Sequence, residues 1–177
     1  MKSIKKLFGL LLAAAALTFA FVACSDDDDD DDNVVATFVT PEFEDSDGET
    51  GKYTITFYDD KTYVVHYDAH EEDDGFTTYW NMTAEKGKYE GAPAKDGDVK
   101  TTATSKIDDS AETEAAAVAL VEAAAEKGSK SFTFTNKHFP LKDIDASDQK
   151  TETKTITDGK VEIDEDKDGN AVYATRK

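Results

Sequence analysis

The stretch KYTITFYDDKTYVVHYD, residues 52–68, decides the fold class of this chain. Tyr53, Ile55 and Phe57 alternate with polar residues, which is the two-residue period of a half-buried β-strand. After an acidic turn, residues 62–68 repeat the alternation, with aromatic or aliphatic residues at every second position. We therefore predict a β-hairpin over residues 52–68, with one face of both strands turned toward a core.

The same alternation recurs along the chain and predicts further strands. These strands are expected over residues 34–40, 76–90, 99–107, 131–136 and 171–175, with a further hairpin over 153–164 on the Asp158-Gly159 turn. Alanine-rich residues 109–127 break the pattern and predict a helix, capped by Asp109 and followed by Gly128. The expected fold class is mainly β: an up-and-down antiparallel β-barrel or a curved meander of about eight strands with one inserted α-helix.

The N-terminus has the pattern of a secretory signal peptide. Residues 1–23 place three lysines before an apolar run and end in small residues next to Cys24, which is the order of n-region, h-region and cleavage region. The apolar run is shorter than the ~20 residues that span a bilayer. Plain secretion and a membrane helix are the alternative interpretations, and the cysteine at the cleavage region argues against the first.

The residues around Cys24 resemble the lipobox of bacterial lipoproteins, and Phe21-Val22-Ala23-Cys24 carry this resemblance. It implies that Cys24 is lipidated and anchors the protein in a membrane. Residues 24–33 are then expected to be an acidic, disordered tether.

The start of that tether carries a second resemblance. It looks like the signal with which some Gram-negative lipoproteins reach the outer face of the outer membrane, and the residues concerned are Ser25, Asp26, Asp27, Asp28 and Asp29. The implied localisation is the cell outer membrane, on its outer surface. The alternative interpretation is a simple spacer between lipid and domain, and both can hold.

Charge limits the classes of partner. Loss of residues 1–23, which hold three lysines and no acidic residue, changes the formal net charge from −19 to −22. Such a charge repels nucleic acid, so we expect no nucleic-acid partner. Because Cys24 is the only cysteine, the single domain expected over residues 34–177 must fold without a disulfide, and nothing indicates a cofactor.

Part of this domain is similar to small bacterial lipocalin-like lipoproteins. The similarity lies in KYTITFYDDKTYVV at residues 52–65, followed by Trp80, GKYEG at 87–91 and KDGDVK at 95–100. It extends over residues 34–177 and implies one lipocalin-like β-barrel.

The aromatic residues of the predicted strands suggest a ligand site. We expect Tyr53 and Phe57 to face the same interior as Trp80, and with Tyr63 these residues are candidates to line a cavity for a small hydrophobic ligand or a glycan. Alternatively they fill the barrel, and the protein is a structural or interaction protein of the cell surface. No nucleophile motif, phosphate loop or spaced carboxylate pair points to catalysis, so we expect no enzyme.

One motif invites a metal interpretation. Residues 164–169, DEDKDG, match the opening of a calcium loop, with oxygen ligands at alternate positions and glycine at the sixth. The twelfth position is Thr175 instead of glutamate, so we predict a plain hairpin turn without a functional metal. His66 and His70 lie roughly 13 Å apart on an extended strand, too far to hold one ion.

Overall fold

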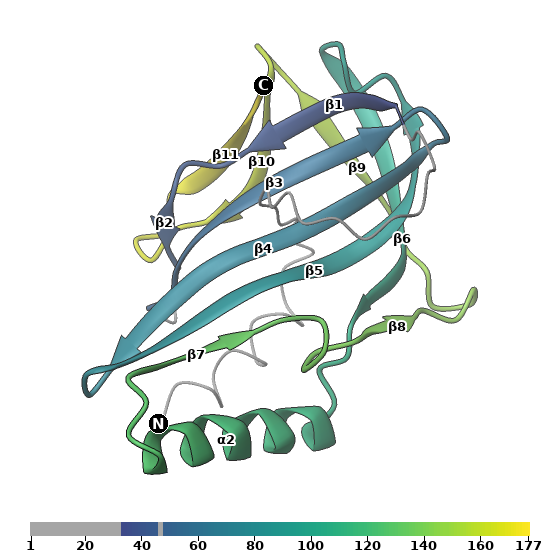
Figure 1. Cartoon of the computed structure of the whole chain (residues 1–177). Coiled ribbons are helices and arrows are strands. Elements are labelled where there is room, and N and C mark those ends of the chain that lie inside the picture. The colour runs from purple at the N-terminus through teal and green to yellow at the C-terminus, as the bar shows by residue number, and fades with distance from the viewer. Residues whose placement is uncertain (1–32, 46–47) are drawn as a thin grey trace.

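The computed structural model describes residues 33–45 and 48–177 (Figure 1). The predicted signal peptide over 1–23, the lipidation site Cys24 and the export signal from Ser25 to Asp29 lie outside the described residues. Of the predicted tether, only Asn33 is described. Within the described ranges, no helix is long and apolar enough to cross a membrane.

The domain is mainly β, with one helix and a sheet curled into a half-barrel, as Figure 1 shows. Eight strands follow one another in the order β10-β11-β1-β3-β4-β5-β6-β8, and β2, β7 and β9 pair at its margins with β3, β5 and β6. The bounds are β1 (Val34–Val39), β2 (Phe43–Glu44), β3 (Thr50–Tyr58), β4 (Thr62–Asp73), β5 (Phe76–Gly91), β6 (Gly97–Ile107), β7 (Ser131–Phe134), β8 (Leu141–Asp143), β9 (Thr151–Ile156), β10 (Lys160–Glu165) and β11 (Ala171–Arg176). The predicted fold class, a curved meander with one inserted helix, is confirmed.

The hairpin predicted over residues 52–68 is confirmed by the register of β3 and β4. Tyr53 lies opposite Tyr67, and Phe57 lies opposite Tyr63. Directly opposite residues share a face of the sheet, so both strands turn their aromatic residues to the buried side, here called the inner face. Strand β4 continues to Asp73 instead of ending near Asp68, because its ladder with β5 extends from His66 to the Asp73–Phe76 pair.

The inner face is divided between two hydrophobic clusters, which corrects the expectation of a single interior. The first lies within the half-barrel and contains Tyr53, Phe57 and Tyr63. The second contains Trp80 and Met82 of β5 and lies between this part of the strand and the helix. Tyr67 packs against both clusters. Trp80 and Tyr53 therefore share a sheet face but not a cluster.

Helix α2 (Ala111–Glu126) covers the second cluster, beneath β7 in Figure 1. Its N-cap is Ser110, whose Oγ accepts a hydrogen bond from the Thr113 N–H, and not the predicted Asp109. The helix buries Ala117 and Val121. Leu120 is 39% exposed, because an alanine-rich helix presents only a narrow apolar stripe.

Strand β7 runs parallel to β5, unlike the other pairs of the sheet. It ends at Phe134, two residues before the predicted end. The Asn136 amide then continues the ladder, since its Oδ1 accepts from the Thr83 N–H and its Nδ2 donates to the Thr83 carbonyl, both at 2.8 Å.

The turn between β9 and β10 is where the two ends of the curled sheet meet. Asp158 and Gly159 adopt φ of 51° and 69°, as the predicted Asp-Gly turn requires. In the described part of the chain, the Thr157–Lys160 bridge directly beside the turn is the only pairing between the two sides, because β9 pairs with β6 and β10 with β11. The predicted hairpin is therefore wrong beyond its turn: tertiary pairing outweighs the local preference.

Candidate functional site

The candidate ligand-lining residues are buried core residues. Phe57 contacts the rings of Tyr63 and Tyr89, with centroids 6.0 and 4.9 Å away. Tyr53 stacks on Tyr67 at 5.5 Å. Trp80 packs against Phe134 in the other cluster. The structure thus brings three of the four candidates together and separates Trp80 from them.

A small hollow lies beside Phe57. This hollow inside the half-barrel measures about 10 Å³, which is the space of about one water molecule. Its lining comes from five strands and comprises Phe38, Ile55, Phe57, Val99, Thr101, Lys154, Ile156 and Val161. Ligand pockets usually measure ~300–1,000 Å³, so this hollow is far too small to hold a ligand of that kind.

One tyrosine–carboxylate pair lies inside the half-barrel. The Tyr63 hydroxyl donates to Glu85 Oε1 at 2.5 Å. Glu85 sits where the register of β4 and β5 shifts, opposite the inward-facing Val65. Burial raises the pKa of the Glu85 carboxyl, and the nearby Glu152 carboxylate raises it further, against the opposing effect of the Tyr63 hydrogen bond. The Lys154 Nζ atom lies 3.6 Å from Glu152 Oε2.

A second acidic group lies where β3 begins and β10 ends. The Tyr67 hydroxyl donates to Glu49 Oε2 at 2.5 Å, and Glu49 is only 3% exposed. Asp164 lies close to Tyr53 and Asp45, and burial followed by the Asp45 charge raises the pKa of its carboxyl. The half-barrel therefore holds two separate groups of acidic side chains: Glu85 with Glu152, and Glu49 with Asp45 and Asp164.

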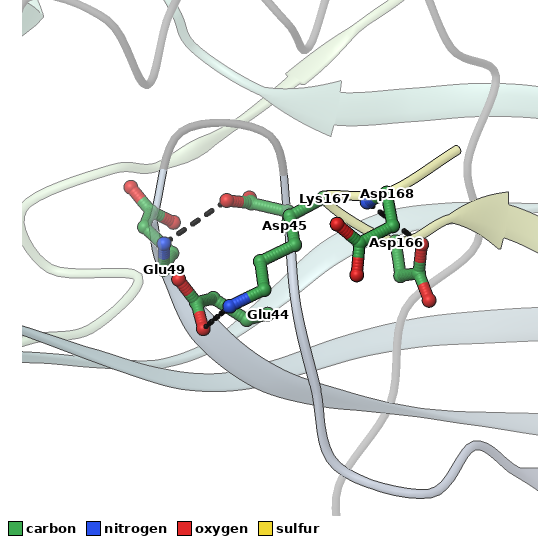
Figure 2. A network of polar contacts seen from close by, with 6 residues as sticks. All are labelled: Glu44, Asp45, Glu49, Asp166, Lys167 and Asp168. Carbon is green, nitrogen blue, oxygen red and sulfur yellow. Dashed lines mark hydrogen bonds and ion pairs between the residues drawn. The ribbon is translucent and has the colours of Figure 1, made fainter. Parts of the chain in front are cut away.

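Figure 2 shows the contacts that join this acidic group to the turn between β10 and β11. Lys167 Nζ pairs with Glu44 Oε2 at 2.8 Å, and the Lys167 N–H donates to the Glu44 carbonyl at 2.9 Å. The Glu49 N–H donates to Asp45 Oδ1 at 3.0 Å. The two Lys167 contacts connect strand β2 with the turn between β10 and β11.

The calcium-like motif at 164–169 forms a turn between two strands, as predicted. Asp166 Oδ1 accepts from the Asp168 and Asn170 N–H groups, each at 2.9 Å, so this carboxylate stabilises its own turn. Among the described residues, no group of three His, Cys, Asp or Glu side chains is placed to hold a metal ion. The absence of a functional metal stays a prediction.

The two strand histidines make separate contacts on the outer face. His66 contacts Asn81 at 3.2 Å and Thr83 at 3.4 Å through its two ring nitrogens. Burial lowers the pKa of His66. His70 lies beside the Tyr79 ring, with centroids 6.1 Å apart.

Sequence reasoning missed the buried carboxylate of Glu49 and the half-buried carboxylates of Glu85 and Asp164. The strict alternation from Phe76 to Ala84 places Glu85 on the outer face, and only the bulge turns it inward. The sequence pattern singled out Asp164 as part of a calcium-like loop, but it did not indicate that this residue lies beside Tyr53.

No protein-family model, curated protein or solved structure matches this chain.

Proposed function

We propose that this chain is a lipid-anchored protein of the cell envelope that is displayed on the outer surface and acts through contacts of its own surface with other macromolecules. The small size of the hollow inside the half-barrel carries the second half of this proposal. The hollow beside Phe57 measures about 10 Å³, which is too small for a ligand, and this supports recognition through the exterior.

The anchor and the display rest on the sequence. The lipobox-like residues before Cys24 support lipidation, and the acidic residues from Ser25 support export. The formal charge of −22 expected after signal removal favours a positively charged partner and disfavours nucleic acid.

A small hydrophobic ligand or glycan, held by Tyr53, Phe57, Tyr63 and Trp80, is the role that a lipocalin-like barrel implies. It would require the first cluster to open, and Trp80 lies in the other cluster. The packed interior therefore favours a surface role.

Lipidation is tested by metabolic labelling with a fatty-acid analogue. Wild-type protein should be labelled and should sediment with membranes, whereas Cys24→Ala should be unlabelled, because it lacks the acceptor thiol. Equal labelling of the two proteins contradicts the anchor.

Surface display is tested by adding proteinase to intact cells. The wild-type domain should be degraded, and a variant with alanine at residues 26–30 should be protected, since it lacks the proposed export signal. A periplasmic protein serves as the integrity control. Equal resistance of both forms would leave the acidic run as a tether only.

A further inference from the structure

The two ends of the curled sheet meet along a seam formed by β9 and β10. From the turn at Asp158 and Gly159 the two strands run apart, as Figure 1 shows. In the described part of the chain, β9 is paired only with β6 and β10 only with β11, apart from the single Thr157–Lys160 bridge. Each strand therefore has one edge without a neighbouring strand.

A strand edge of this kind has a defined chemical complement. Its backbone N–H and C=O groups accept an extended peptide as an additional strand, and pockets for alternate side chains supply the specificity. Both β9 and β10 are six residues long, which is the typical length of a strand.

The side chains along the seam change character from its narrow end to its wide end. Near the turn, Ile156 of β9 and Val161 of β10 line the small apolar hollow. At the far end of β9, Glu152 lies opposite the buried Thr101 and so faces inward. At the far end of β10, Asp164 approaches Tyr53.

Acidic groups outnumber basic ones at the wide end. Glu152 is close enough to Glu85 to raise its pKa, while Lys106 and Lys154 lower it, and burial is the largest effect. Asp164 has acidic neighbours in Asp45 and Glu165. Added positive charge would therefore lower the electrostatic energy of this end of the seam.

We propose that the seam between β9 and β10 takes up an extended, basic segment of a partner protein as an added strand, with an apolar side chain toward Ile156 and Val161 and lysine or arginine toward Glu152 and Asp164. This inference rests on the proposed surface role and names the chemistry of its partner. The backbone edges supply binding, and the acidic wide end selects the charge.

The competing explanation is that these inward charges protect the edges. Charged side chains pointing inward on an edge strand are a common defence against unwanted strand pairing, and Lys154 beside Glu152 fits that description. The two explanations predict different results with a short peptide.

The test is fluorescence anisotropy with the full chain in detergent and a labelled six-residue peptide. The peptide has the sequence Thr-Val-Thr-Lys-Thr-Lys. Binding should be saturable. It should be lost when alternate backbone amides are N-methylated, because methylation removes the donors that a strand needs. It should also be lost when glutamates replace the lysines.

Variants of the chain identify the seam. Glu152→Gln with Asp164→Asn should weaken binding roughly a hundredfold, since the double variant removes two close charge pairs and each such pair contributes about tenfold or more. Glu162→Gln is the control for Asp164→Asn: it also removes one negative charge from β10, but its side chain faces outward beside Tyr173 and is exposed.

Several outcomes overturn the proposal. They are no binding at millimolar peptide, equal binding of the N-methylated peptide, equal weakening by Glu162→Gln, or a dimer of the chain that sediments without peptide and occupies the edge. Each of them leaves labelling at Cys24 and proteinase access unchanged, so failure of the seam is distinguishable from failure of the proposed function.

Discussion

Replacing Trp80 by alanine removes the indole that fills the space between β5 and helix α2. Trp80 is 1% exposed, and its ring lies 6.1 Å from that of Phe134. Truncation of a buried tryptophan costs ~3–5 kcal/mol in the free energy of unfolding. Among the residues that the structure describes, the buried indole N–H has no hydrogen-bond partner, so truncation removes no hydrogen bond found there. We therefore expect the lower end of the range, about 3 kcal/mol.

For a domain of this size, each kcal/mol lowers Tm by about 2–4 °C, so the expected decrease is roughly 6–12 °C. Urea unfolding should be followed by far-UV circular dichroism, because Trp80 is the only tryptophan and its fluorescence disappears in the variant.

The matched control is Tyr79→Ala, one residue earlier on the same strand and 44% exposed. It should change the free energy of unfolding by less than about 1 kcal/mol. If Trp80→Ala does not fold, Trp80→Phe, which keeps a ring in the cluster, should fold with a smaller loss. A loss below about 1 kcal/mol for Trp80→Ala, at an unchanged urea m-value, would refute the assignment of Trp80 to the core.

Two further predictions concern charged groups of the half-barrel. The folded-state pKa values of Glu85 and Asp164 are raised. The stability that these groups contribute is therefore fully present below the unfolded carboxyl pKa of about 4 and is lost as the pH rises through their folded-state values. When the pH is lowered from 8 to 5, the urea midpoint should increase, and it should increase less in Glu85→Gln. An identical pH profile for Glu85→Gln would contradict this. The Asp96 carboxylate accepts hydrogen bonds from the Asp158 and Gly159 N–H groups at 2.7 and 3.1 Å and from Arg176 at 3.0 Å. Asp96→Ala should therefore speed hydrogen exchange of these two amides, whereas the control Asp98→Ala should leave it unchanged. Equal exchange rates in wild type and Asp96→Ala would rule out this anchoring.

Local pattern was sufficient where neighbouring residues in the chain also pair in space. The hairpin of β3 and β4 follows from the alternation around Tyr53 and Tyr63, because the buried face and the short turn together allow one register. The turn at Asp158 and Gly159 likewise follows from two residues that tolerate positive φ. The change to an alanine-rich segment was enough to locate helix α2.

Only the tertiary structure decided which elements meet. Nothing in residues 151–165 indicates that β9 joins β6 while β10 joins β11, because strand edges offer the same backbone groups to any partner. A one-residue bulge turned Glu85 from the outer face to the inner face, and alternation read along a single strand contains no such shift. The separation of Trp80 from Tyr53 and the near absence of free space around Phe57 depend on how the sheet curls and how side chains fill it, and these are properties of the packed domain.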